Sequence, residues 1–125
     1  MFPSWQPWLE KYKSVPQSEM FLLVDLMLNS DMLLSTRMSY GVPFIYRLGP
    51  IGYFNIDKKR GLYFGFYWGK LLLKHDSSGI LDPDDRKMVK LVYLKDRVNN
   101  EDFLGAFLAL LDEAIRIDEQ RYRKN

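Results

Sequence analysis

The feature that most constrains the fold is the run 38–69, which contains ten of the aromatic residues of the chain and six of its eight glycines. Within this run, short stretches of alternating side chains are separated by turn residues. The pattern is typical of consecutive antiparallel strands, because side chains in a strand point alternately to its two faces. We therefore expect the sheet of this protein to be built around the run.

Gly49 and Pro50 have the residue types of a two-residue type II′ turn. Glycine adopts the positive φ needed at the first position, and proline adopts the negative φ needed at the second. Such a turn fixes how the two flanking strands pair. It predicts Tyr46 opposite Tyr53 and Ile45 opposite Phe54.

A second turn is predicted at 57–61, where Asp57 and Gly61 flank three basic residues. This turn predicts Ile56 opposite Leu62, Phe54 opposite Phe64 and Tyr53 opposite Gly65. The Tyr53 ring is then placed to cover the bare backbone of Gly65, because a cross-strand aromatic ring can pack over a glycine.

The two predicted registers agree on which side chains share a face. The first face, called here the phenylalanine face, is expected to be the core. It carries Ile45, Phe54, Ile56, Leu62, Phe64 and Phe66. The second face, called here the tyrosine face, carries Phe44, Tyr46, Tyr53, Asn55, Tyr63 and Tyr67.

Two helices are predicted before the sheet. Ser4 can cap a helix over 4–12. Ser14 and Gln17 have the spacing of a capping box, in which the serine oxygen accepts from the backbone amide three residues on and the glutamine side chain reaches back to the start of the helix. A second helix is expected over 15–28, where a wide apolar stripe faces the core.

Further strands are expected on both sides of the aromatic run. Residues 33–40 alternate with a period of two, which predicts a strand. Gly41 and Pro43 predict a kink or bulge after it. Residues 71–73 are expected to finish a strand, and 88–94 to add one more.

A final helix is expected from Asn99 or Asn100, whose side chain can cap it. Its apolar stripe consists of Phe103, Leu104, Phe107, Leu108, Leu111, Ala114 and Ile115. The sequence therefore predicts one α+β domain over 1–125, with helices in 1–30, a mostly antiparallel sheet of four to five strands in 33–95 and a helix in 100–120. The helices are expected to pack on one face of the sheet.

Composition excludes several functional classes. The 18 basic and 16 acidic residues give a formal charge of +2, which is too balanced to indicate nucleic-acid binding. The sequence has no cysteine and no long apolar run, so we expect no thiolate chemistry and no membrane partner. The first residues lack the pattern of a signal peptide, which leads us to expect a cytoplasmic protein.

Several short motifs resemble the YdhG-like family of small bacterial proteins, long described as a domain of unknown function. They are Met-Ser-Tyr-Gly-Val-Pro-Phe at 38–44, Ile-Gly-Tyr-Phe at 51–54, Phe-Gly-Phe-Tyr-Trp-Gly at 64–69 and Asp-Glu-Ala at 112–114. Their order and spacing agree with the family pattern. Val42 departs from it, because methionine is commonest at that position.

The resemblance implies a YdhG-like or frataxin-like fold. It also implies one sharp alternative function, since a member of the family is described as a frataxin-like iron chaperone. Iron as a cofactor is implied by the resemblance alone. Iron sites of this type use clustered carboxylates, and the predicted first two helices carry only Glu10, Glu19 and Asp25.

Two polar motifs are further candidate sites. His75 is the only histidine and falls in a predicted loop, where it is either a surface residue or one ligand of a larger site. Asp82, Asp84 and Asp85 offer oxygen ligands for a hard cation. They lack a calcium-loop pattern, however, and equally fit a turn followed by the start of a helix.

The tyrosine face is the strongest candidate site. Its candidate binding residues are Tyr40, Tyr46, Tyr53, Asn55, Tyr63 and Tyr67. Tyrosine combines a broad apolar ring with a polar tip, which suits interfaces and ligand pockets. The alternative is that Trp68, the segment after Gly69 and the first helix simply cover this face.

We therefore expect a non-enzymatic binding or interaction module. Its partner would be a second copy of the chain, another protein or a small ligand. The first alternative is the iron chaperone. A further alternative is an enzyme that acts on a small ligand, with Arg47, Asn55 or His75 beside the aromatic face.

Overall fold

The computed structural model describes residues 3–84 and 86–123. Its five strands form one sheet in the order β1-β2-β3-β4-β5, with each strand antiparallel to its neighbour. They are β1 (Ser35–Ser39), β2 (Val42–Tyr46), β3 (Pro50–Asp57), β4 (Gly61–Phe66) and β5 (Lys90–Tyr93). The predicted α+β fold with an antiparallel sheet is confirmed.

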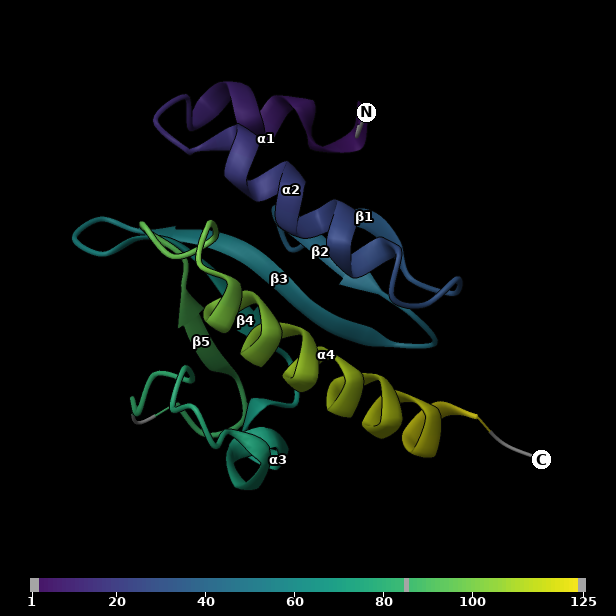
Figure 1. The fold of residues 1–125 in the computed structure, drawn as a ribbon. Coiled ribbons are helices and arrows are strands. Elements are labelled where there is room, and N and C mark those ends of the chain that lie inside the picture. The colour runs from purple at the N-terminus through teal and green to yellow at the C-terminus, as the bar shows by residue number, and fades with distance from the viewer. Residues whose placement is uncertain (1–2, 85, 124–125) are drawn as a thin grey trace.

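The helices gather on the phenylalanine face of this sheet. They are the 3-10 helix η1 (Pro3–Trp5), α1 (Gln6–Lys11), α2 (Gln17–Leu28), α3 (Gly69–Leu72), the 3-10 helix η2 (Leu73–His75) and α4 (Glu101–Tyr122). Figure 1 shows α2 and α4 on the same side of the sheet. Helices α1, α2, α3 and α4 all contribute buried side chains to one core cluster, which also contains Phe54, Phe64 and Phe66.

The β3–β4 hairpin has the predicted register. Ile56 lies opposite Leu62, Phe54 opposite Phe64 and Tyr53 opposite Gly65. A Cβ atom added to Gly65 would lie 3.0 Å from the Tyr53 ring, so this ring does cover the glycine backbone. The register was predictable because the turn at its tip is local. Asp57 accepts hydrogen bonds there from the amides of Lys59 and Arg60.

The predicted register of the β2–β3 hairpin is wrong. Phe44, and not Tyr46, lies opposite Tyr53, and Ile45 lies opposite Gly52, with a bulge between Ile45 and Tyr46. The shift relative to the prediction is two residues. Because side chains in a strand alternate with a period of two, the shift leaves every side chain on its predicted face.

This register differs because the turn is longer than a type II′ turn. Tyr46 pairs with Pro50, and Gly49 does not have a positive φ. The backbone amides of Leu48 and Gly49 instead donate to the Asp118 carboxylate on α4, at 3.0 and 2.8 Å. A residue distant in sequence therefore fixes the turn.

The predicted kink after β1 is a tight hairpin turn. Tyr40 has φ of 51° and Gly41 has φ of 75°, and Ser39 pairs with Val42 across them. Two consecutive residues with positive φ define a type I′ turn. Pro43 then lies within β2, opposite Met38.

Neither predicted serine cap forms. Helix α1 begins at Gln6 and α2 at Gln17, and no side chain makes a capping hydrogen bond at either start. Pro7 lies in the first turn of α1, and Pro16 immediately precedes α2. Proline fixes φ near the helical value and has no amide hydrogen to satisfy, so it defines these starts without a cap.

The segment after β4 also departs from the prediction. Residues 71–73 belong to α3 and η2 rather than to a strand. At Gly69 an added Cβ atom would meet the backbone of Lys90, so glycine allows this turn to approach β5 closely. The last strand and the last helix are confirmed: β5 lies within 88–94, and the Asn100 side chain accepts from the Phe103 amide at 3.0 Å.

Candidate functional site

Aromatic rings cross the tyrosine face from the β1–β2 turn to β5. This aromatic ladder consists of Tyr40, Phe44, Tyr46, Tyr53, Tyr63 and Tyr93. The centroids of successive rings in contact lie 5.3 to 6.3 Å apart. These distances are in the range of favourable edge-to-face and offset-stacked pairs, so each ring helps to fix the orientation of its neighbours.

An arginine stacks on each end of the ladder. The guanidinium carbon of Arg37, from β1, lies 3.8 Å from the centre of the Tyr46 ring. At the opposite edge, the guanidinium carbon of Arg60 lies 3.6 Å from the Tyr93 ring, and Arg60 also pairs with Asp82 at 3.0 Å. Each edge of the face therefore carries a stacked guanidinium, of which that of Arg60 is paired with a carboxylate, whereas the centre of the face is aromatic.

Exposure varies across the face. Phe44 and Tyr63 are buried, whereas Tyr46, Tyr53, Asn55 and Tyr67 are half-buried. Tyr40 is 89% exposed. A shallow depression of about 310 Å³ is lined by Tyr40, Val42, Phe44, Tyr53, Asn55 and Tyr67. The structure thus places all six predicted site residues on one surface, and four of them line one depression.

Most of the segments that could cover the tyrosine face lie away from it. Trp5 packs on Phe54 with ring centroids 6.1 Å apart, so the N-terminal helical segment lies on the phenylalanine face. Trp68 stacks with Arg121 of α4 at 3.8 Å. The segment that carries Arg86 does approach the tyrosine face, and the buried Lys90 holds it by donating to the Arg86 carbonyl at 2.6 Å.

Tyr40 combines an exposed ring with an unfavourable backbone conformation. Its φ of 51° lies in the left-handed region, which glycine and asparagine adopt far more readily than tyrosine. Such a conformation costs about 1–3 kcal/mol. Because the ring is also exposed, packing within the protomer does not account for tyrosine at this position.

Partial burial changes the titration of the central tyrosines. Burial raises the pKa of Tyr53, against the opposing effect of the Arg86 charge. Burial and the neighbouring Tyr53 raise the pKa of Tyr63. Both phenols therefore keep their protons in the folded state at pH values where the unfolded state loses them.

We predict that stability falls in alkali because of these two phenols. Their contribution is fully present below the ordinary tyrosine pKa of about 10 and is lost as the pH rises through the higher folded-state values. Urea denaturation at a series of pH values measures the free energy of unfolding. Its decline across this range should be smaller in the double variant Tyr53→Phe with Tyr63→Phe than in the wild-type protein. An equal decline in the variant would contradict the assignment.

The side chains of the polar motifs contact other charged side chains. His75 Nε2 lies 3.6 Å from a Glu113 carboxylate oxygen, in a groove beside α4. Asp82 pairs with Arg60 at 3.0 Å and Asp84 with Arg86 at 3.1 Å, whereas Asp85 lies outside the described residues. Among the residues that the structure describes, no three histidine, cysteine or acidic side chains are grouped to hold a metal ion. No group of the described residues can therefore be named as the ligands of the predicted iron.

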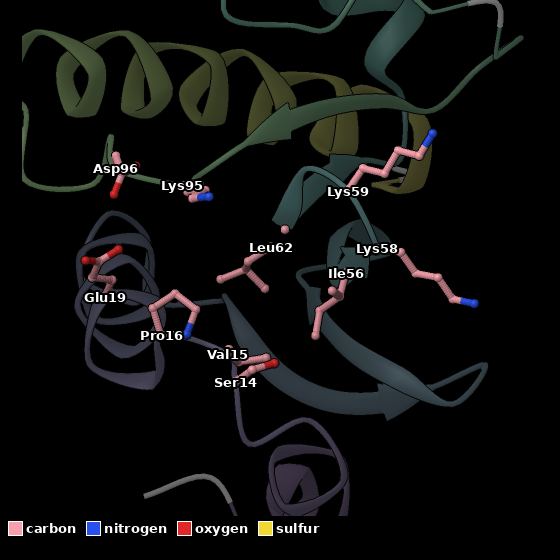
Figure 2. A pocket seen from close by; sticks show the side chains of 11 residues that line it. Ser14, Val15, Pro16, Glu19, Ile56, Lys58, Lys59, Leu62, Lys95 and Asp96 are labelled. Carbon is pink, nitrogen blue, oxygen red and sulfur yellow. The ribbon is translucent and has the colours of Figure 1, made fainter.

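A second cleft, of about 400 Å³, lies between the start of α2, the β3–β4 hairpin and the turn after β5. Figure 2 shows its apolar floor, which includes Val15 and Leu62. Glu19 and Asp96 lie on one side of the floor, and the side chain of Lys58 extends away from it on the other side. The lining also includes Lys59 and Lys95, so the cleft carries charges of both signs.

Tyr93 of the aromatic ladder is not among the six predicted site residues. Tyr93 extends the ladder because it lies opposite Tyr63 in the neighbouring strand. The alternation of side chains in 88–94 indicates which residues of this strand share a face with Tyr93. Arg47 is one of the residues predicted to lie beside the aromatic face. Its side chain is only 7% exposed and pairs with Asp31 at 3.1 Å and with Asp118 at 3.2 Å. Arg47 is therefore part of the packing between α4 and the β2–β3 turn.

The fold and this face define a small α+β protein with an aromatic cluster on its sheet. Comparisons with family models, with curated proteins and with solved structures find no match to the chain. The resemblance to the YdhG-like family therefore stays a prediction. Within the described residues, no helix has both the length and the apolar character needed to cross a membrane.

Proposed function

We propose that this protein is a non-enzymatic interaction module whose tyrosine face contacts a second copy of the chain. The observation that supports this proposal is the exposed ring of Tyr40, held at an unfavourable φ and joined through Phe44 to the aromatic ladder. Exposed tyrosines are enriched at protein interfaces, where a few of them supply much of the binding energy.

The chemistry of the face favours a second copy as the partner. Its central polar groups are phenols and the Asn55 amide, which both donate and accept hydrogen bonds. A two-fold axis through the centre would therefore bring together groups that can pair with themselves. The stacked arginines Arg37 and Arg60 lie at the edges, and Arg86 is paired with Asp84. Like charges therefore need not meet at the centre of such a dimer.

Light scattering tests the proposal. We expect the wild-type protein to have twice the chain mass of 14.9 kDa. Tyr40→Arg should weaken dimerisation by at least about tenfold, because it removes an aromatic contact and places a charge in the interface. Tyr53→Ala with Tyr63→Ala should have the same effect. Tyr122→Ala, on α4, is the matched control and should remain dimeric.

Tyr40→Arg keeps the test decisive even if the double variant unfolds. Tyr63 is buried, so its loss also affects stability, whereas Tyr40 is 89% exposed and its ring is removed at little cost to the fold. A wild-type protein of monomer mass would refute the dimer. Dimerisation that persists undiminished in Tyr40→Arg would show that the copies meet through another surface.

A further inference from the structure

A groove of about 610 Å³ runs between the α3–η2 segment and α4. Helix α3 has only four residues, Gly69–Leu72. Within this turn Leu72 is fully buried and anchors the segment to the core. Its neighbours Leu71 and Leu73 are 38% and 47% exposed, and both line the groove together with Ile117 of α4. The groove therefore has an apolar lining that the fold does not bury.

The rim of the groove is strongly basic. It carries Lys70, Lys74 and Arg116. The acidic residue in its lining is Glu113, whose carboxylate already lies 3.6 Å from His75 and 3.7 Å from Arg116. Neither Lys70 nor Lys74 belongs to the ion pairs found among the described residues. Positive charge at this rim is therefore only partly neutralised.

We propose that this groove binds an acidic amphipathic segment of a partner protein. Apolar side chains of the segment would contact Leu71, Leu73 and Ile117. Its carboxylates would meet Lys70, Lys74 and Arg116. The arrangement corresponds to helix-in-groove recognition, in which an amphipathic helix lays its apolar face along a groove and charged residues at the rim set its specificity.

The shape of the site favours a peptide over a lipid surface. Basic and apolar residues together can also bind anionic membranes. A flat bilayer, however, contacts a convex surface best. The leucines lie along a groove walled by two helical segments, as the residues that line it show. A single chain segment can enter such a groove and contact its lining and its rim together.

Fluorescence anisotropy with a designed peptide tests the proposal. The probe is a dye-labelled amphipathic peptide of leucine and glutamate at helical spacing. We expect it to bind the wild-type protein at least about tenfold more tightly than the same peptide with lysine in place of glutamate. Lys70→Glu with Lys74→Glu should abolish this preference. Lys58→Glu with Lys59→Glu, an equal change of net charge on the β3–β4 hairpin, should keep it.

A second variant separates the groove from bulk electrostatics. Leu71→Ser with Leu73→Ser keeps every charge but removes apolar contacts, and it should weaken binding of the acidic peptide by at least about tenfold. Equal loss in the two lysine double variants would refute a local site. Absence of binding by the acidic peptide would refute the proposal, and binding of phosphatidylglycerol vesicles through the same residues, without peptide binding, would replace it with a membrane contact.

Discussion

We expect Asp118→Ala to lower the free energy of unfolding by about 3–5 kcal/mol, the loss typical of removing one partner from a buried ion pair. The Asp118 side chain is fully buried. It accepts hydrogen bonds from the amides of Gly49 and Leu48 and from Arg47 Nη1, at 2.8, 3.0 and 3.2 Å. The alanine variant leaves two amides without this acceptor and Arg47 with less compensation for its buried charge.

Urea denaturation of two aspartate variants of α4 measures this effect. Asp112→Ala is the matched control, because Asp112 is exposed on the same helix and should change stability by less than about 0.5 kcal/mol. Asp118→Asn should retain little of the stabilisation, since an amide nitrogen cannot accept the bonds that the carboxylate accepts. A difference of less than about 1 kcal/mol between Asp118→Ala and Asp112→Ala would contradict this role.

Asp118 also explains why one hairpin could be registered from the sequence and the other could not. The β3–β4 turn is stabilised by Asp57, within the turn itself. The β2–β3 turn is stabilised from α4, at a separation of 69 residues between Gly49 and Asp118. Local residue types predict the first kind of turn and miss the second, because a distant carboxylate satisfies amides that a type II′ turn would pair differently.

The composition of the two faces was nevertheless predictable. A strand has a period of two, so the error of two residues in the register left Phe44, Tyr53 and Ile45 on their predicted faces. The exposure of single residues was not predictable in the same way. Tyr63 is buried and Tyr40 is open, although both belong to the ladder. That difference depends on the type I′ turn and on the strand β5 that borders Tyr63.

The stacked arginines show a second limit. Arg37 of β1 lies over Tyr46 of β2, and Arg60 of the β3–β4 turn lies over Tyr93 of β5. Their positions depend on sheet order and on side-chain conformation, neither of which alternation alone specifies. The aromatic face could be predicted from sequence, whereas its charged edges required the assembled sheet.

We expect Phe64→Ala to lower the free energy of unfolding by about 3–5 kcal/mol, as for other large-to-small changes in a core. Phe64 is fully buried, with the rings of Phe54 and Phe66 each 5.0 Å away and that of Phe107 5.6 Å away. Its loss therefore opens a cavity where β3, β4 and α4 meet. Thermal and urea denaturation measure the change.

Two further variants test whether the phenylalanine face, and not the exposed Tyr40 ring, stabilises the fold. Phe64→Leu keeps most of the volume and should cost less than Phe64→Ala. Tyr40→Ala removes a ring that is 89% exposed and should change the stability of the monomer by no more than about 0.5 kcal/mol. Similar losses in Phe64→Ala and Tyr40→Ala would contradict the assignment of the phenylalanine face to folding and of Tyr40 to binding. A large loss at Phe64 alone would support the division, because it would show that the Tyr40 ring adds little to the stability of the folded protomer.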